Sequence, residues 1–120
     1  MNKNTTEDKQ GNTIKLRNDI NCKTRGVIYG MWCDKCDKII YVGETKNSVR
    51  DRFYQHRHDF TINKKDTPAA HFRIEGHDGW TNLKIIGLER VSTRNIGYRL
   101  VRERYWMRKM GTINEENRKR

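Results

Sequence analysis

Three separate stretches of the chain are short and mostly apolar, and each stretch predicts a β-strand. Residues 26–33 read GVIYGMWC, residues 39–43 read IIYVG, and residues 83–91 read LKIIGLERV. All three are rich in β-branched and aromatic residues, which favour strands. The polar segment DKCDK joins the first two stretches. The pair therefore predicts a β-hairpin, and the third stretch predicts a separate strand.

Helical spacing of apolar residues predicts three helices. The first spans about 48–60 and begins at Ser48, where Ser48 and Asp51 resemble a capping box. The second spans 67–76, opening with a Thr-Pro pair and stopping at a glycine. The third is capped by Ser92 or Thr93, runs to about Met110 and ends at a glycine.

The resulting order, β-β-α-α-β-α, indicates an α+β fold with a small, mostly antiparallel three-stranded sheet flanked by helices. A parallel doubly wound sheet is disfavoured because a tight turn joins the first two strands. Residues 1–20 are polar and show no sustained period, so we expect a flexible arm there. We expect one domain over residues 21–114 and a basic tail over 115–120.

Composition narrows the class of partner. The 120 residues carry a formal net charge of +11, and only 33% of them are hydrophobic. Such a positive excess favours a polyanion, for which DNA is the natural candidate. No apolar run is long enough to span a membrane and no signal peptide is visible, so we expect no membrane partner. The cysteine usage indicates a reducing, intracellular compartment, and the terminal NRKR reads either as a nuclear address or as a solvated tail.

The first predicted helix carries an arginine and a histidine on or beside its apolar side. Val49, Phe53 and Phe60 fall on one stripe, His56 lies within that stripe, and Arg52 lies at its edge. A cation placed there needs a partner. A bound phosphate is one reading. The other is an arginine that reaches solvent beside a core histidine bonded to a carbonyl.

A lone carboxylate occupies the apolar stripe of the last predicted helix. Ile96, Leu100, Met107 and Met110 lie at i, i+4, i+11 and i+14, with Glu103 among them. Glu103 is either a structural acid paired with a core arginine or a ligand for Mg²⁺ or Mn²⁺, which prefer hard oxygen donors.

Cysteine and histidine spacing predicts a zinc site. Cys33-x-x-Cys36 lies in the predicted hairpin turn, and His71 and His77 lie at the second helix, close to the spacing of zinc-binding histidine pairs. The alternatives are reduced thiols with surface histidines, or a redox pair. A redox pair is disfavoured because this motif does not open a helix. Cys22 alone reads as a buried or idle thiol.

The combined motifs resemble a known family. Ile28-Tyr29 followed by Tyr41-Val42-Gly43 resembles the two signature motifs of the GIY-YIG nucleases, with Val27 in place of the first glycine. The Cys-x-x-Cys between the motifs and the run YVGET resemble the endonuclease domain of Penelope-like retroelements. That resemblance implies a Cys2His2 zinc site, a metal-binding Glu103, a fused or associated reverse transcriptase, and Asn114 as a counterpart of a late family asparagine.

The resemblance implies a metal-dependent DNA endonuclease that nicks DNA for retroelement integration. Tyr29 would serve as general base or orient the water, Arg52 would clamp the phosphate, and Glu103 would hold the ion. Arg52 is chosen over Arg50 because it lies four residues before His56. Tyr41 and His56 complete the polar wall, and Gly43 lets the backbone approach closely. The competing reading is a catalytically inactive, zinc-stabilised nucleic-acid-binding module. Nucleic-acid contacts are expected from five cationic side chains: Lys46, Arg50, Arg57, Arg99 and Arg102.

Overall fold

A three-stranded antiparallel sheet forms the centre of the protein. The computed structural model describes residues 5–15, 20–62, 64, 67–73, 79, 83–91 and 94–112. The strands are β3 (Arg25–Cys33), β4 (Lys38–Ser48) and β5 (Leu83–Arg90), in the order β4-β3-β5. The predicted α+β class and antiparallel sheet are confirmed. β4 extends beyond the predicted 39–43, because its polar end continues to pair with the start of β3.

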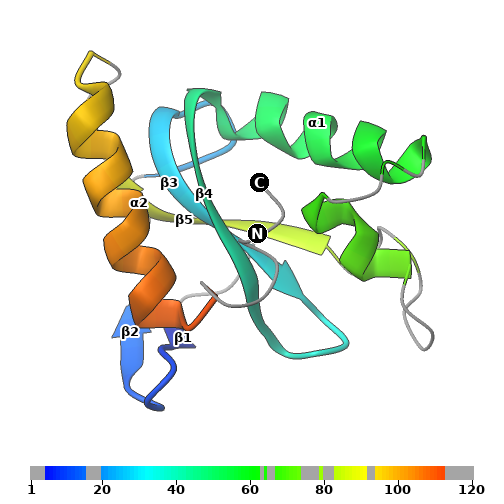
Figure 1. Ribbon diagram of the computed structural model, residues 1–120, viewed down its shortest axis with the longest axis horizontal. Coiled ribbons are helices and arrows are strands. Elements are labelled where there is room, and N and C mark those ends of the chain that lie inside the picture. The colour runs from blue at the N-terminus through cyan, green and yellow to red at the C-terminus, as the bar shows by residue number, and fades with distance from the viewer. Residues whose placement is uncertain are drawn as a thin grey trace.

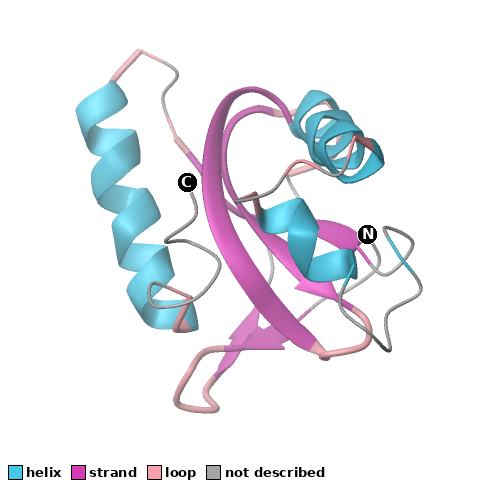
Figure 2. Ribbon diagram, turned by 45° about the vertical axis from the view of Figure 1, so that its right-hand side comes forward, coloured by secondary structure: helices cyan, strands magenta, loops and turns pink. Residues whose placement is uncertain are grey.

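The sheet is covered on both faces, which explains its dense apolar composition. One face packs against α2 (Ile96–Met110), and the other packs against α1 (Val49–Thr61) and the 3₁₀ helix η1 (Pro68–Arg73). Figures 1 and 2 show α2 on one side of the sheet and the other two helices opposite. Leu83 and Ile85 face α1, whereas Ile86 and Leu88 face α2, as their alternation predicts.

The start of α1 agrees with its capping signal. The Ser48 side chain accepts a hydrogen bond of 3.1 Å from the Asp51 backbone N–H, which satisfies one of the unpaired donors of the first turn. Val49 and His56 are buried on the side that faces the sheet. The short helix predicted over 67–76 is a 3₁₀ helix over its described part.

The start and rotation of α2 differ from the prediction. Its N-cap is Asn95, whose Oδ1 accepts from the Tyr98 backbone N–H at 2.9 Å; Ser92 and Thr93 lie outside the described residues. Ile96 and Leu100, placed on the apolar stripe by their spacing, are exposed by 63% and 47%. Glu103, Met107 and Met110 of that stripe are buried as predicted, but the buried side also takes in Arg99 and Trp106, which bind carboxylates of the sheet strands. The buried side consists of Arg99, Glu103, Trp106, Met107 and Met110.

A β-hairpin lies in the segment for which the sequence predicted no element. Strands β1 (Thr5–Glu7) and β2 (Thr13–Lys15) pair antiparallel. Beyond β1, the Lys9 backbone N–H donates to the Lys109 carbonyl at 3.0 Å, which ties the hairpin turn to the end of α2 (Figure 1). Three-residue strands are too short to produce a visible period. Among the described helices, none has the length and hydropathy needed to cross a membrane.

Candidate active site

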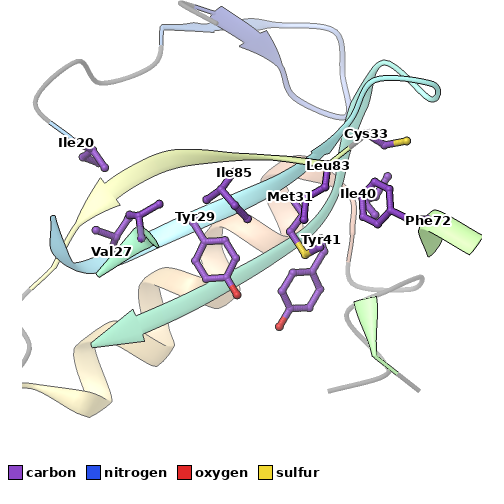
Figure 3. Packing of buried hydrophobic residues seen from close by; sticks show 11 residues of the cluster. Ile20, Val27, Tyr29, Met31, Cys33, Ile40, Tyr41, Phe72, Leu83 and Ile85 are labelled. Atoms are coloured by element: carbon purple, nitrogen blue, oxygen red, sulfur yellow. The ribbon is translucent and has the colours of Figure 1, made fainter. Parts of the chain in front are cut away.

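Two tyrosines from neighbouring strands form the floor of the candidate site. Tyr29 on β3 and Tyr41 on β4 both face the α1 side of the sheet, with ring centroids 6.3 Å apart. Figure 3 shows the two rings beside each other with both hydroxyls pointing the same way. Both residues are buried. Strand alternation thus gathers two phenols at one place.

Gly43 makes room for these rings. It pairs with Tyr29 across the β3–β4 ladder. A Cβ at residue 43 would lie 2.6 Å from the Tyr29 hydroxyl oxygen and 2.8 Å from Cε2 of Tyr41. Distances this short are essentially never seen for a real Cβ. The glycine is therefore required by the close approach of the rings.

Helix α1 adds an arginine and a histidine one turn apart. Arg52 Nε donates to the Tyr29 hydroxyl oxygen at 2.8 Å, and Arg52 is hydrogen-bonded to Tyr41 as well. The Tyr29 oxygen also lies 2.8 Å from His56 Nε2. Because that oxygen already accepts from Arg52, we assign the phenol O–H as the donor to Nε2. His56 Nδ1 then carries the proton, and it is buried without a hydrogen-bond partner among the described residues.

Burial keeps both Tyr29 and His56 neutral. Burial and the nearby Arg52 charge lower the pKa of His56 to about 3. Burial also raises the pKa of Tyr29, and Tyr41 and Glu103 add to the rise while Arg52 opposes it. Desolvation therefore outweighs the opposing Arg52 charge, and the pKa of the Tyr29 phenol stays raised. At neutral pH the resting site holds a phenol and a neutral imidazole.

Glu103 approaches the site from the opposite helix. It is 3% exposed on the inner side of α2, and its charge contributes to the raised pKa of Tyr29. One turn earlier, Arg99 Nε donates to Glu44 Oε2 at 2.9 Å. Glu44 directly follows Gly43 on β4. This pair anchors α2 to the strand segment that lies beneath the tyrosines.

Arg99 and Arg102 are not the exposed phosphate contacts that the sequence suggested. Arg99 is 3% exposed and paired with Glu44. Arg102 donates to both carboxylate oxygens of Glu89 through Nε and to one of them through NH2, at 2.7–3.0 Å. Sequence reasoning missed Glu44, because its partner lies 55 residues away and leaves no local signal.

The remaining predicted side chains are placed as follows. Arg50 is exposed beside an apolar hollow that Cys22 also lines, so only Arg52 of the two candidate arginines joins the tyrosine cluster. Cys22 is exposed and is therefore not a buried thiol. Lys46 and Arg57 are exposed. Asn114 lies outside the described residues.

A second cluster of side chains can hold a metal ion. Cys33 ends β3, Cys36 lies in the turn that follows, and His71 lies in η1. Their ligand atoms all lie within 4.8 Å of one another, with Cys36 Sγ 3.4 Å from His71 Nε2. Thiolate and imidazole donors in this number suit a tetrahedral ion. His77, the predicted fourth ligand, lies outside the described residues.

The donor chemistry of the first cluster suits a different ion. Glu103 supplies a carboxylate, and a hard oxygen donor of this kind fits Mg²⁺ or Mn²⁺. Such an ion keeps several waters and needs only one or two carboxylates from the protein. Two chemically distinct metal sites are therefore compatible with the chain.

Comparison with protein families matches residues 25–117 to the GIY-YIG catalytic domain. The matched range begins at β3 and includes both candidate metal clusters, whereas the β1–β2 hairpin lies before it. Comparisons with curated proteins and with solved structures gave no match.

Proposed function

The chain belongs to the GIY-YIG family of nucleases, and from this premise we propose that it is a metal-dependent endonuclease that hydrolyses phosphodiester bonds in DNA. The observation that carries the proposal is the hydrogen-bonded chain Arg52–Tyr29–His56, with Tyr41 beside it and the charge of Glu103 acting on the same phenol. A structural core would gain little from these groups, because each buried polar group must be compensated.

Arg52 is the member of the cluster that substrate would meet first. The two tyrosines, His56 and Glu103 are buried, whereas Arg52 is only partly buried. Its planar guanidinium is suited to non-bridging phosphate oxygens and to the charge that develops on them in the transition state. We assign Arg52 the phosphate clamp.

Tyr29 orients the attacking water and keeps its proton in the resting site, since burial raises its pKa. Ionisation of the phenol would require additional positive charge at the site. The O–H donated to His56 Nε2 fixes the direction of the Tyr29 hydroxyl, and Tyr41 completes the polar wall. Glu103 would hold a divalent ion, which when bound supplies Lewis acidity toward the scissile phosphate and the leaving oxygen.

The Cys33–Cys36–His71 cluster has a structural role in this proposal. A zinc ion there, with His77 as fourth ligand, would tie the β3–β4 turn to η1. Such a tie stabilises a small core, because metal binding contributes directly to the free energy of folding.

The narrower biological role is also a proposal. The Cys-x-x-Cys between the two signature motifs and the run YVGET support kinship with Penelope-like retroelement endonucleases. This kinship implies nicking of chromosomal DNA in the nucleus, in association with a reverse transcriptase.

A plasmid-nicking assay in Mg²⁺ or Mn²⁺ tests the activity. The wild-type protein should convert supercoiled to open-circular plasmid, and Glu103→Gln should abolish conversion while the fold is retained. Cys22→Ser, a change at an exposed thiol, serves as the control preparation. If the folded, metal-loaded wild type binds DNA without nicking it, the protein is a binding module and the endonuclease proposal is wrong.

A further inference from the structure

The outer side of α2 concentrates exposed apolar and aromatic side chains. Among the described residues, the other large hydrophobic side chains that are exposed are Tyr54 on α1 and Ile62 at its C-terminal end. Single exposed hydrophobics need no explanation, but a concentration on one element marks an interaction site. The five that lie on α2 are Ile96, Tyr98, Leu100, Val101 and Tyr105.

Three of these residues form one stripe. Tyr98, Val101 and Tyr105 lie at i, i+3 and i+7, so they share a side of the helix. The Arg102 guanidinium lies 4.4 Å from the centre of the Tyr105 ring and is itself held by Glu89. The Tyr105 ring is therefore fixed in place before any partner arrives, which lowers the entropy that binding must offset.

The charged side chains that α2 itself places beside the stripe are all positive. Glu103 is the only acid within α2, and it is buried on the other side. Arg104 and Arg108 are exposed next to the stripe, and Lys109 is half-buried on its other flank. The helix thus presents rings and apolar side chains between cations, with no carboxylate of its own on that side.

A hollow of about 260 Å³ continues this surface toward the N-terminal hairpin. The Asp8 carboxylate lines this hollow. It accepts hydrogen bonds from the Gln10 and Asn12 backbone N–H groups and is thereby held within the hairpin turn. The Tyr105 ring lines this hollow together with three cationic residues. Its lining residues are Asp8, Lys9, Gln10, Tyr105, Arg108 and Lys109.

We infer that this side of α2 is a docking surface for an unpaired DNA strand. A second copy of the chain would bring like charges together, since each carries +11. A nucleic-acid strand has a partner for each kind of side chain. Its phosphates bind Arg104 and Arg108, and its base faces stack on the tyrosines. A duplex keeps its base faces inside the stack and offers only the phosphates.

The consequence for the nuclease is a substrate class, and this step rests on the proposed function. An α-helix with its side chains is about 10 Å across. A strand that lies along the outer side of α2 is separated from Glu103 by the width of this helix, and Arg52 lies on the other face of the sheet. The preferred DNA would therefore carry a single-stranded or unpaired segment at some distance from the cleaved bond.

Binding can be measured without cleavage. We would use the Glu103→Gln protein with its zinc retained, in buffer without Mg²⁺ or Mn²⁺, and follow fluorescence anisotropy with a labelled single-stranded oligonucleotide and its blunt duplex. The test variant is Tyr98→Leu combined with Tyr105→Leu. Tyr54→Leu is the control, because Tyr54 is an exposed tyrosine that lies on α1 (53%). Circular dichroism and Tm establish that each variant is folded.

The double variant should weaken single-strand binding by about 10-fold or more and duplex binding by less than about 2-fold, since each stacked ring contributes appreciably to binding. The Tyr54→Leu control should change neither. Arg108→Gln should weaken both and reduce the salt dependence of binding. Unchanged single-strand binding in the double variant, or an equal loss for single strand and duplex, overturns the inference. A nicking-inactive wild type would contradict the proposed endonuclease and leave this binding result standing.

Discussion

Replacing Gly43 with alanine tests whether the tyrosine cluster is as tightly packed as the structure indicates. The added Cβ would lie 2.6 Å from the Tyr29 hydroxyl oxygen and 2.7 Å from its Cζ. Backbone atoms of β4 hold Cβ in place, so the Tyr29 ring must move. That movement pulls the hydroxyl away from Arg52 Nε and His56 Nε2, each 2.8 Å from it.

The expected cost follows from two terms. Overpacking a closed core site costs about 1–3 kcal/mol, and each weakened hydrogen bond of the buried phenol adds about 1 kcal/mol. With two such hydrogen bonds, we expect Gly43→Ala to lower the free energy of unfolding by about 3–5 kcal/mol. A catalytic group displaced by ~1 Å loses about 100-fold in rate, so nicking per folded molecule should fall by about that factor.

Two other glycines supply controls. The three atoms nearest to a Cβ at Gly30 would all belong to the Ile39 side chain, with Cδ1 at 2.9 Å, on the face of the sheet that packs against α2. Gly30→Ala should cost about 1–2 kcal/mol and leave nicking per folded molecule intact. A Cβ at Gly97 would contact only Asn95 Oδ1, at 3.7 Å. Gly97→Ala should stabilise the helix by about 0.5 kcal/mol.

Urea denaturation gives the free energies, and plasmid nicking at matched concentrations of folded protein gives the rates. The reasoning is refuted if Gly43→Ala is folded and nicks at the wild-type rate. It is also refuted if Gly30→Ala loses as much activity per folded molecule as Gly43→Ala, because the effect would then reflect general loosening of the sheet.

Three further predictions follow from the contacts. Cys36→Ser should reduce bound zinc from one equivalent to well below it and lower Tm, as measured by metal analysis and calorimetry, whereas Cys22→Ser should retain the metal. The pKa of His56 is lowered to about 3 in the folded state, so the unfolded chain binds that proton more readily between about pH 6.5 and 3. Stability should therefore fall as pH drops through this window, by at most about 1.4 kcal/mol per pH unit, and His56→Gln should flatten the profile; an unchanged slope contradicts the assignment. Arg99→Met should cost about 2 kcal/mol by denaturation, less than a fully buried pair because Glu44 is partly exposed. Adding Glu44→Met should restore part of that loss, and no restoration would show that the two residues act independently.

Local signals in the sequence were sufficient for the elements whose determinants lie within a few residues. The capping hydroxyl of Ser48 and its Asp51 partner are one turn apart, and the αL glycine at the end of α2 directly follows the last helical residue. The antiparallel sheet followed from the short link between the first two strands.

Where the sequence was misleading, the deciding contact was distant. The spacing predicted a buried stripe that includes Ile96 and Leu100, but the Arg99–Glu44 pair and the Trp106 hydrogen bond to Glu89 shift the buried side away from these two residues. The polar end of β4 forms strand because β3 offers it backbone partners, not because of its own pattern. The N-terminal hairpin is likewise held by a backbone hydrogen bond to the end of α2.

The sequence by itself determined the order of the elements, the antiparallel sheet and the residue types available for chemistry. Helical spacing favoured Arg52 over Arg50, but only the tertiary structure decided that Arg52 Nε bonds to the Tyr29 hydroxyl and that burial keeps that phenol protonated. The physical reason is the distance along the chain over which each interaction acts. Periodicity and capping act over one or two turns of chain, whereas desolvation and ion pairing depend on groups that folding brings together from tens of residues apart.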